Sequence, residues 1–162
     1  MSNAVDYRDR QIDVLAFDGV HLAGEHLALQ RLVAPGESGK AIAGVARLAQ
    51  TFMIRLLTGL GSIPYLEEEG TDFIPAFRRG EVRTSLEAEQ VFQSAMVDLK
   101  RQFLAEETDD QPADEKLQSV ELLSVAHFAD RVVYRIRIRN QAGGEITTLL
   151  PLTAVLQPES LV

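Results

Sequence analysis

Residues 38–73 read SGKAIAGVARLAQTFMIRLLTGLGSIPYLEEEGTDF, and this stretch decides how the rest of the chain is organised. Its first part carries apolar side chains at steps of three and four, the repeat that places them on one side of a helix of about five turns. These side chains are Ile42, Val45, Leu48, Ala49, Phe52, Met53, Leu56 and Leu57. Ser38 is suited to cap the first turn, and Gly59 with Gly61 is suited to close the last. The stretch therefore predicts a core helix from Ser38 to Thr58.

A turn and an acidic run follow this helix without apolar periodicity of their own. Three consecutive glutamates stand between two aromatic residues, Tyr65 and Phe73. We expect the two rings to anchor the segment, while the glutamates face solvent or basic residues of a neighbouring subunit. The candidate partner-contact residues of this segment are Tyr65, Glu67, Glu68, Glu69 and Asp72.

The order of these short motifs resembles a known family. A helix ending in Leu-Leu-Thr58, then Gly61-Ser-Ile-Pro-Tyr65 and Gly70-Thr-Asp-Phe73, is similar to the baseplate wedge family of contractile phage tails and related injection machines. Its members are also called sheath initiators, and some carry a lysozyme-like label. The order of elements agrees from about Gln11 to Leu156. The family's Glu-Pro-Arg signature is not visible, since Asp114-Glu-Lys-Leu117 stands near its place.

The resemblance implies a structural role in a virion. It implies a non-enzymatic component, assembled in the host cytoplasm, that lies in the tail baseplate next to the central tube and belongs to a ring of copies. Its partners are then other baseplate wedge, tube and sheath proteins, and its terminal strands nucleate the sheath by strand addition. The alternative is another tail, neck or adaptor structural protein of the same particle.

Length and composition set limits on these expectations. At 162 residues the chain is expected to form a single domain, residues 1–162. The net charge of −8 argues against nucleic acid as a partner. Without cysteine there is neither a disulfide framework nor a thiolate metal site, and no apolar run approaches the length of a membrane helix, so we expect a soluble protein without membrane contact.

The N-terminal part, residues 11–33, has alternating apolar residues that favour two short strands in an irregular hairpin. A helix over Glu25–Leu32 is the competing interpretation. The following loop, Ala34–Ala41, contains Lys40 and invites comparison with a nucleotide-binding P-loop. It lacks the first glycine and the magnesium-binding hydroxyl, so we expect no cofactor there.

Two core helices with a connecting turn are expected over residues 38–105. Residues 74–82 read as a loop, and Thr84 with Glu87 forms a capping box that begins the second helix. Its apolar side is Val91, Phe92, Ala95, Met96, Leu99 and Phe103. Residues 106–116 are rich in carboxylates and predict a solvated, mobile linker.

From residue 117 to 156 the apolar period changes from helical to two, which predicts a three-stranded antiparallel meander. The clearest strand is 131–139, and the strand after it is predicted to be an edge because Pro151 lacks a ladder donor. Alternation places four arginines on one face, as a cationic stripe able to pair with carboxylates. The alternative interpretation is a solvated face whose charges discourage aggregation. The candidate interface residues are Arg131, Arg135, Arg137, Arg139, Ile146, Thr148 and Leu150.

Catalytic and metal sites have little support in the sequence. His21, His26 and His127 lie far apart, and none shows a metal-ligand spacing. A glycosidase-like hydrolase working through the carboxylates between Glu67 and Asp72 needs one carboxyl in an apolar pocket, and consecutive glutamates in a turn argue against it. We therefore expect an α+β domain, two main helices packed on a small antiparallel sheet with a C-terminal hairpin or meander, without catalytic, cofactor or metal site.

Overall fold

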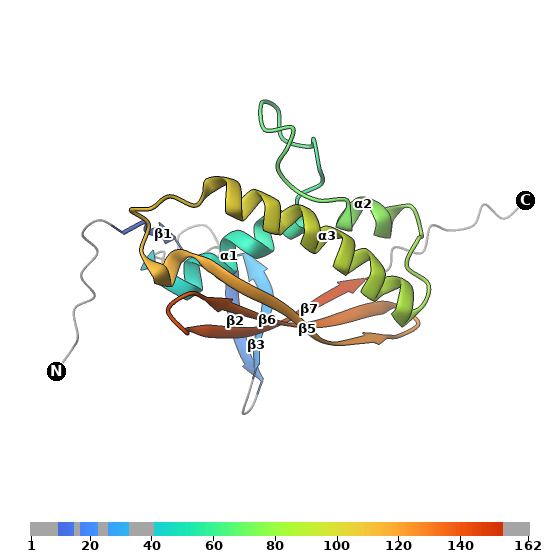
Figure 1. Ribbon diagram of the computed structural model, residues 1–162. Helices are drawn as coiled ribbons and strands as arrows, with labels where there is room; N and C mark the ends of the chain where they lie inside the picture. The colour runs from blue at the N-terminus through green and yellow to red at the C-terminus, as the bar shows by residue number, and fades with distance from the viewer. Residues whose placement is uncertain (1–9, 15–16, 23–25, 33–40, 154–162) are drawn as a thin grey trace, which may run out of the picture.

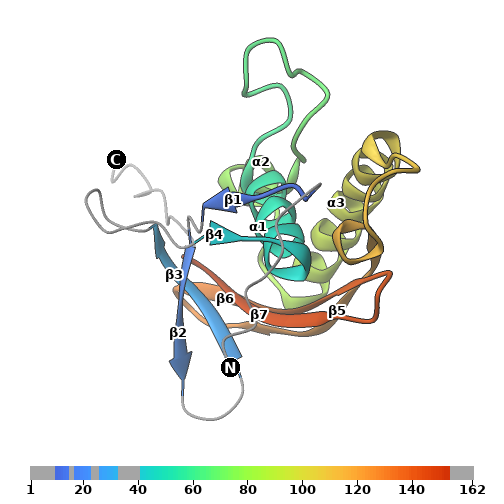
Figure 2. The ribbon, with the colours of Figure 1, turned by 90° about the vertical axis from the view of Figure 1, so that its left-hand side faces the viewer.

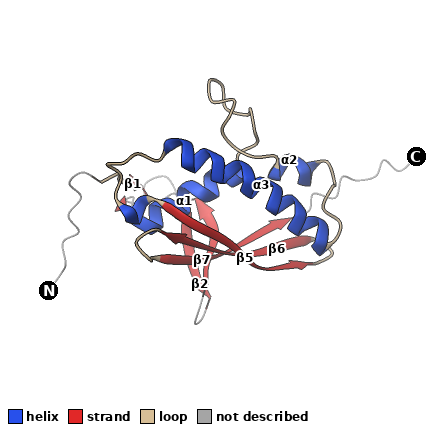
Figure 3. Ribbon diagram, viewed as in Figure 1, coloured by secondary structure: helices blue, strands red, loops and turns tan. Residues whose placement is uncertain are grey.

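The computed structural model describes residues 10–14, 17–22, 26–32 and 41–153. Three helices lie together on one face of a sheet, as Figures 1 and 3 show. They are α1 (Gly44–Leu57), α2 (Phe73–Arg78) and α3 (Ser85–Glu106). Two main helices packed on a sheet with a C-terminal meander confirm the predicted α+β fold. No described helix is both long and apolar enough to cross a membrane.

The sheet has five strands in the order β2-β3-β7-β6-β5. Its C-terminal part is the predicted meander, in which each strand pairs antiparallel with the next: β5 (Leu117–His127), β6 (Arg131–Asn140) and β7 (Glu145–Thr153). Two N-terminal strands extend it, β2 (Phe17–Leu22) and β3 (His26–Leu32). β3 runs parallel to β7 and is paired with it at two positions, Leu27 with Thr148 and Ala28 with Leu149.

An irregular hairpin lies within residues 11–33 as predicted, but its first strand is β2, and Asp13–Val14 belong to a separate sheet. β2 and β3 pair antiparallel, with a register shift between Asp18 and Gly19. The competing helix over Glu25–Leu32 is wrong, because the backbone of residues 26–32 is a strand between two partners. A separate two-stranded sheet, β1 (Asp13–Val14) with β4 (Ala41–Ile42), lies near the start of α1 (Figure 2).

The first core helix begins six residues later than predicted. Ser38 and the Lys40 loop lie outside the described residues, and α1 begins at Gly44 after a cap residue, Ala43, whose side chain makes no capping hydrogen bond. The apolar repeat predicted too early a start for the helix, because Ile42, the first residue of the repeat, belongs to the strand β4. Gly44 has a φ of 60°, a conformation that glycine adopts readily and other residues rarely, so it separates strand from helix.

The segment predicted as a loop at residues 74–82 contains α2, so that prediction is wrong. Pro75 misled the sequence reading: in the first turn of a helix its missing N–H breaks no hydrogen bond. Phe73 and Ala76 are buried, and tertiary packing thus stabilises a helix of only six residues.

The second predicted helix is confirmed as α3. The Thr84 hydroxyl accepts from the Glu87 N–H at 3.2 Å, and the Glu87 carboxylate accepts from the Thr84 N–H at 3.0 Å, which completes the capping box. The predicted apolar side faces the core: Phe92, Ala95, Met96 and Leu99 are buried, and Val91 and Phe103 pack against them.

Four aromatic rings form the centre of the core. Phe73 makes edge contacts with Phe77, Phe92 and Tyr134, with ring centroids 5.3, 6.2 and 5.3 Å away. The Tyr134 hydroxyl donates to the carbonyl oxygen of Ala88 at 3.1 Å, and burial raises the pKa of this phenol. These contacts join α2, α3 and β6 into one hydrophobic layer.

The acidic linker at residues 106–116 is only partly solvated. Thr108 to Asp110 are exposed, but Ala113–Glu115 form a 3-10 turn, η1, and Glu115 is 2% exposed. The Glu115 carboxylate accepts from the Gln11 N–H at 3.2 Å, and Asp114 pairs with Arg10 at 2.5 Å. The prediction of a mobile connection is therefore wrong for this end, which fastens the N-terminal segment to the domain.

Candidate functional site

The four arginines predicted to share a face do so, on the side of β6 opposite the helices. Val132, Tyr134, Ile136 and Ile138 alternate with them and are buried in the core. No described helix covers the outer side of β5, β6 and β7 (Figure 3). We call this side the arginine face, defined by Arg131, Arg135, Arg137 and Arg139.

The arginine face contains its own carboxylates. Arg137 pairs with Glu121 of β5 at 3.3 Å, and Arg139 pairs with Glu145 of β7 at 2.9 Å. The Arg131 guanidinium lies 5.2 Å from the centre of the Phe128 ring, a cation–π distance. The arginine face thus carries a row of four cationic side chains, two of them paired with glutamates among the described residues, in a chain of net charge −8. It is therefore complementary to an acidic surface.

The strand β7 is not an edge, so that prediction is wrong. It lies between β6 and β3, and Pro151 is accommodated because β3 pairs only with positions 148 and 149. Thr148 and Leu150 are 1% and 4% exposed and Ile146 packs against the core, so these three predicted contact residues face the helices.

The edge of the meander is instead β5. No described strand pairs with it on the side away from β6. Its eleven residues include one charged side chain, Glu121, and two register shifts interrupt its pairing with β6. Sequence reasoning missed this edge because the apolar alternation of a strand reports its faces and not its neighbours.

The acidic segment after α1 forms a loop over residues 58–72 that rises away from the helices, as Figures 1 and 2 show. We call it the projecting loop. Glu67 and Glu68 are exposed as predicted, and Glu69 is half-buried. Phe73 is fully buried and anchors the segment, but Tyr65 is 99% exposed, so its predicted anchoring role is wrong.

The base of the projecting loop is closed by a set of backbone hydrogen bonds. Leu60 N–H donates to Thr71 O and Thr71 N–H donates to Thr58 O, each at 2.9 Å. The buried Thr71 hydroxyl donates to Leu56 O at 3.0 Å and accepts from the Phe73 N–H at 3.1 Å. The loop therefore leaves the domain and returns to it at one fixed point.

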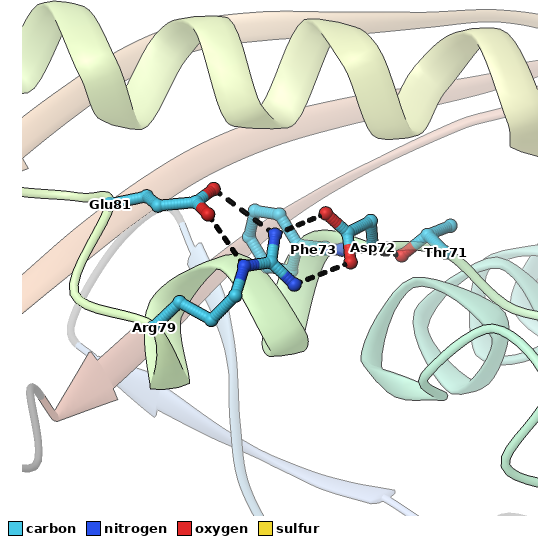
Figure 4. Close-up of polar contacts among 5 residues, drawn as sticks. All are labelled: Thr71, Asp72, Phe73, Arg79 and Glu81. Carbon is cyan, nitrogen blue, oxygen red and sulfur yellow. Dashed lines mark hydrogen bonds and ion pairs between the residues drawn. The ribbon is translucent and has the colours of Figure 1, made fainter.

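Asp72, another predicted contact residue, is held within the chain. Figure 4 shows the Arg79 guanidinium between two carboxylates. It donates to Asp72 at 3.0 and 2.5 Å and to Glu81 at 2.5 and 3.1 Å. Hydrogen bonding to Arg79 holds the pKa values of both carboxyls below their ordinary values and raises that of the arginine. A carboxyl group whose pKa is lowered in this way remains ionised near neutral pH, so it makes a poor general acid.

No cluster of three or more potential metal ligands occurs among the residues with described positions. Among those same residues, Glu67 and Glu68 of the projecting loop are exposed, whereas Asp72 lies at its base and is bound to Arg79. Comparison of the chain with protein-family models, with curated proteins and with solved structures finds no match in any of the three.

Proposed function

We propose that this protein is a non-enzymatic structural component of a contractile tail baseplate, which joins the baseplate wedge to the tube and nucleates the sheath by strand addition. The proposal places the protein in the virion, in a ring of copies in contact with wedge, tube and sheath proteins. Its first support is the similarity of the 58–73 motifs to the sheath-initiator family. The observation that carries it further is an edge strand, β5, next to a cationic sheet face.

The β5 edge offers what strand addition requires. Successive residues of an antiparallel strand direct their backbone groups alternately to the two sides, so about half of the N–H and C=O groups of β5 point away from β6. Edge strands are usually protected by several charges, a proline or bulges, and β5 has one charged side chain, Glu121, and two register shifts. An incoming extended segment would bind these groups through main-chain hydrogen bonds.

The arginine face supplies selectivity for that segment. Arg137 of β6 is paired with Glu121 of β5, so the row of arginines lies one strand inward from the edge where a strand would add. Acidic side chains on the same side of the incoming strand would reach across β5 toward the guanidiniums of β6, and guanidiniums bind carboxylates in a planar, two-point geometry. The partner segment is therefore expected to be extended and acidic on one side.

Tails assembled with a triple variant test the role of the face. We expect Arg135→Ser, Arg137→Ser and Arg139→Ser together to give a folded protein that enters baseplates but does not nucleate sheath, seen by electron microscopy. A matched control replaces three exposed arginines on the helical side by serine: Arg78, Arg83 and Arg101. Normal contractile tails from the first variant would falsify the proposal.

Single cysteines locate the partner strand, because the chain contains no cysteine of its own. Ser124 is exposed on β5, and Ser94 is exposed on α3. We expect a maleimide to label Ser124→Cys fully in the purified protein and poorly in sheathed tails, whereas Ser94→Cys stays reactive in both. Equal labelling of position 124 before and after sheath assembly contradicts strand addition at β5.

A further inference from the structure

The projecting loop has an apolar tip that nothing described in the chain covers. Tyr65 is 99% exposed and its neighbour Leu66 is 45% exposed, while Leu60, near the base of the same loop, is 50% exposed. Single exposed apolar residues are common, but three on one loop, on a base fixed by hydrogen bonds, form a presented surface. Tyrosine at such a tip supplies large contact area and few rotatable bonds to a partner.

The backbone conformation of Tyr65 is a second, independent indication that this residue contacts a partner. Its φ is 71°, and it is the only described residue other than glycine with a positive φ. The left-handed conformation is unfavourable for a residue with a Cβ, and a fully exposed ring recovers none of that free energy inside the monomer. A turn built for stability alone would place glycine or asparagine at this position.

A matching pocket lies elsewhere on the domain, between the C-terminal end of α3 and the start of β5. Its volume is about 180 Å³, and it is lined by Lys100, Phe103, Leu104, Glu107, Leu117 and Gln118. Leu104 is 70% exposed at this site. Lys100 is exposed and forms no ion pair with any residue whose position is described. We call it the α3–β5 pocket.

Tip and pocket complement each other in size and in charge. Phe103, Leu104 and Leu117 offer apolar walls to an aromatic ring, and the volume is of the order of one tyrosine side chain. Of the two charged residues that line the pocket, Glu107 is paired with Lys116 at 3.6 Å, and Lys100 is opposite in sign to the exposed Glu67 next to the tip. The projecting loop extends away from the helices in both views (Figures 1 and 2), and none of its residues lines the pocket of its own chain.

We infer that the tip of the projecting loop of one copy, with Tyr65 at its centre, inserts into the α3–β5 pocket of a second copy. The two surfaces are different, so the contact is head-to-tail and each copy keeps one free tip and one free pocket. Repetition of such a contact builds a ring or an open chain of copies. The inference specifies the neighbour contact within the ring of the proposed function, and it requires no tail component to be tested.

The contact is expected to be weak between two free copies. One loop tip covers much less than the ~800 Å² per partner of a stable complex, so dissociation constants in the high micromolar range are expected. In a closed ring each copy is held by two neighbours, which strengthens the same contact through effective concentration.

Sedimentation of the purified full chain, from about 10 μM to about 1 mM, tests the inference. We expect concentration-dependent association that Tyr65→Ser and Leu104→Ser each weaken at least about tenfold, while Tyr65→Phe retains it. Val97→Ser is the matched control, since Val97 is also 70% exposed on α3 but does not line the pocket. Circular dichroism verifies that each variant is folded.

A photo-crosslinking amino acid at position 65 identifies the surface it meets. The expected product is a covalent dimer joined to the peptide that contains Phe103 and Leu104 or to the one that contains Leu117, and Leu104→Ser reduces its yield. A chain that stays monomeric throughout, an association insensitive to Tyr65→Ser, or a cross-link to another surface each overturns the inference. Because purified protein is used, these results are independent of whether sheath nucleates in the assembly assay.

Discussion

The side-chain amide of Gln102 makes both of its hydrogen bonds to the backbone of Gly70. Its Oε1 accepts from the Gly70 N–H at 3.3 Å, and its Nε2 donates to Gly70 O at 2.7 Å. Gln102 is 8% exposed, and it fixes the base of the projecting loop to α3. One side chain thus determines where an otherwise solvent-exposed loop is attached.

Gln102→Leu should loosen that attachment. The substitution leaves a buried N–H and C=O of Gly70 without partners, at a cost of about 2–4 kcal/mol in unfolding free energy. Hydrogen exchange at the Gly70 and Thr71 amides should accelerate more than exchange in β6. Gln90→Leu, at an exposed position of the same helix, should change stability by less than ~0.5 kcal/mol. Equal effects of the two substitutions would refute this role of Gln102.

Gly70→Ala should be among the most destabilising single substitutions in the chain. A Cβ on Gly70 would lie 2.6 Å from Thr58 O, and its φ of 95° already disfavours any other residue. We expect a loss of about 3 kcal/mol or more, measured by urea denaturation. Gly143→Ala is the control, since its φ is 85° but no atom lies within 4 Å, so it should lose only about 1–2 kcal/mol. A smaller loss at position 70 than at 143 would contradict the close approach.

Tyr65→Gly should raise stability. Removing a Cβ from a left-handed residue gains about 1–2 kcal/mol, and the added freedom of glycine in the unfolded chain returns about 0.4–1 kcal/mol. The expected net change is a stabilisation of about 0.5–1 kcal/mol by denaturant titration. A variant that gains stability but loses self-association identifies Tyr65 as a contact residue, because substitution of a structural residue would lower stability. Destabilisation by the glycine would show that the ring supports the monomer.

The Asp72–Arg79–Glu81 cluster should respond to acid. Both carboxyls have pKa values lowered from ordinary values of 3.8 and 4.5, so their contribution to stability is present above those values and is lost as pH falls through the folded-state pKa values. We expect Arg79→Gln to return both pKa values toward ordinary ones, measured by carbon NMR of the carboxyl groups. Both side chains are exposed, so stability at pH 7 should hardly change. Unaltered carboxyl pKa values in the variant would rule out the proposed cause.

Local signals in the sequence were sufficient for α3 and β6. The capping box at Thr84 marks a helix start with backbone chemistry, and the alternation around Tyr134 determines both faces of a strand. α2 could not be predicted this way, because its six residues depend on Phe73 reaching rings from α3 and β6 that are distant in the sequence.

The candidate contact residues also divide into those predicted by local signals and those that depend on long-range contacts. The period of two predicted that the arginines share one face, and the polarity of Glu67 and Glu68 was sufficient to predict their exposure. The edge assigned to β7 failed because strand order depends on β3, which pairs with it from the other end of the chain. Tyr65 is predicted both to anchor the segment and to contact a partner, and only the three-dimensional path of the loop shows that its ring is exposed.

The parallel pairing of β3 with β7 determines when the five-stranded sheet can form as the chain is synthesised. Leu27 and Thr148 are about 120 positions apart, so β3 leaves the ribosome long before its partner strand exists. Until then the β2–β3 hairpin has no sheet to join, and an isolated two-stranded hairpin is only marginally stable in water. Closure of the five-stranded sheet is therefore a late step with a large loop-closure entropy. Premature release of a nascent chain truncated before Glu145 would leave β3 without its partner strand.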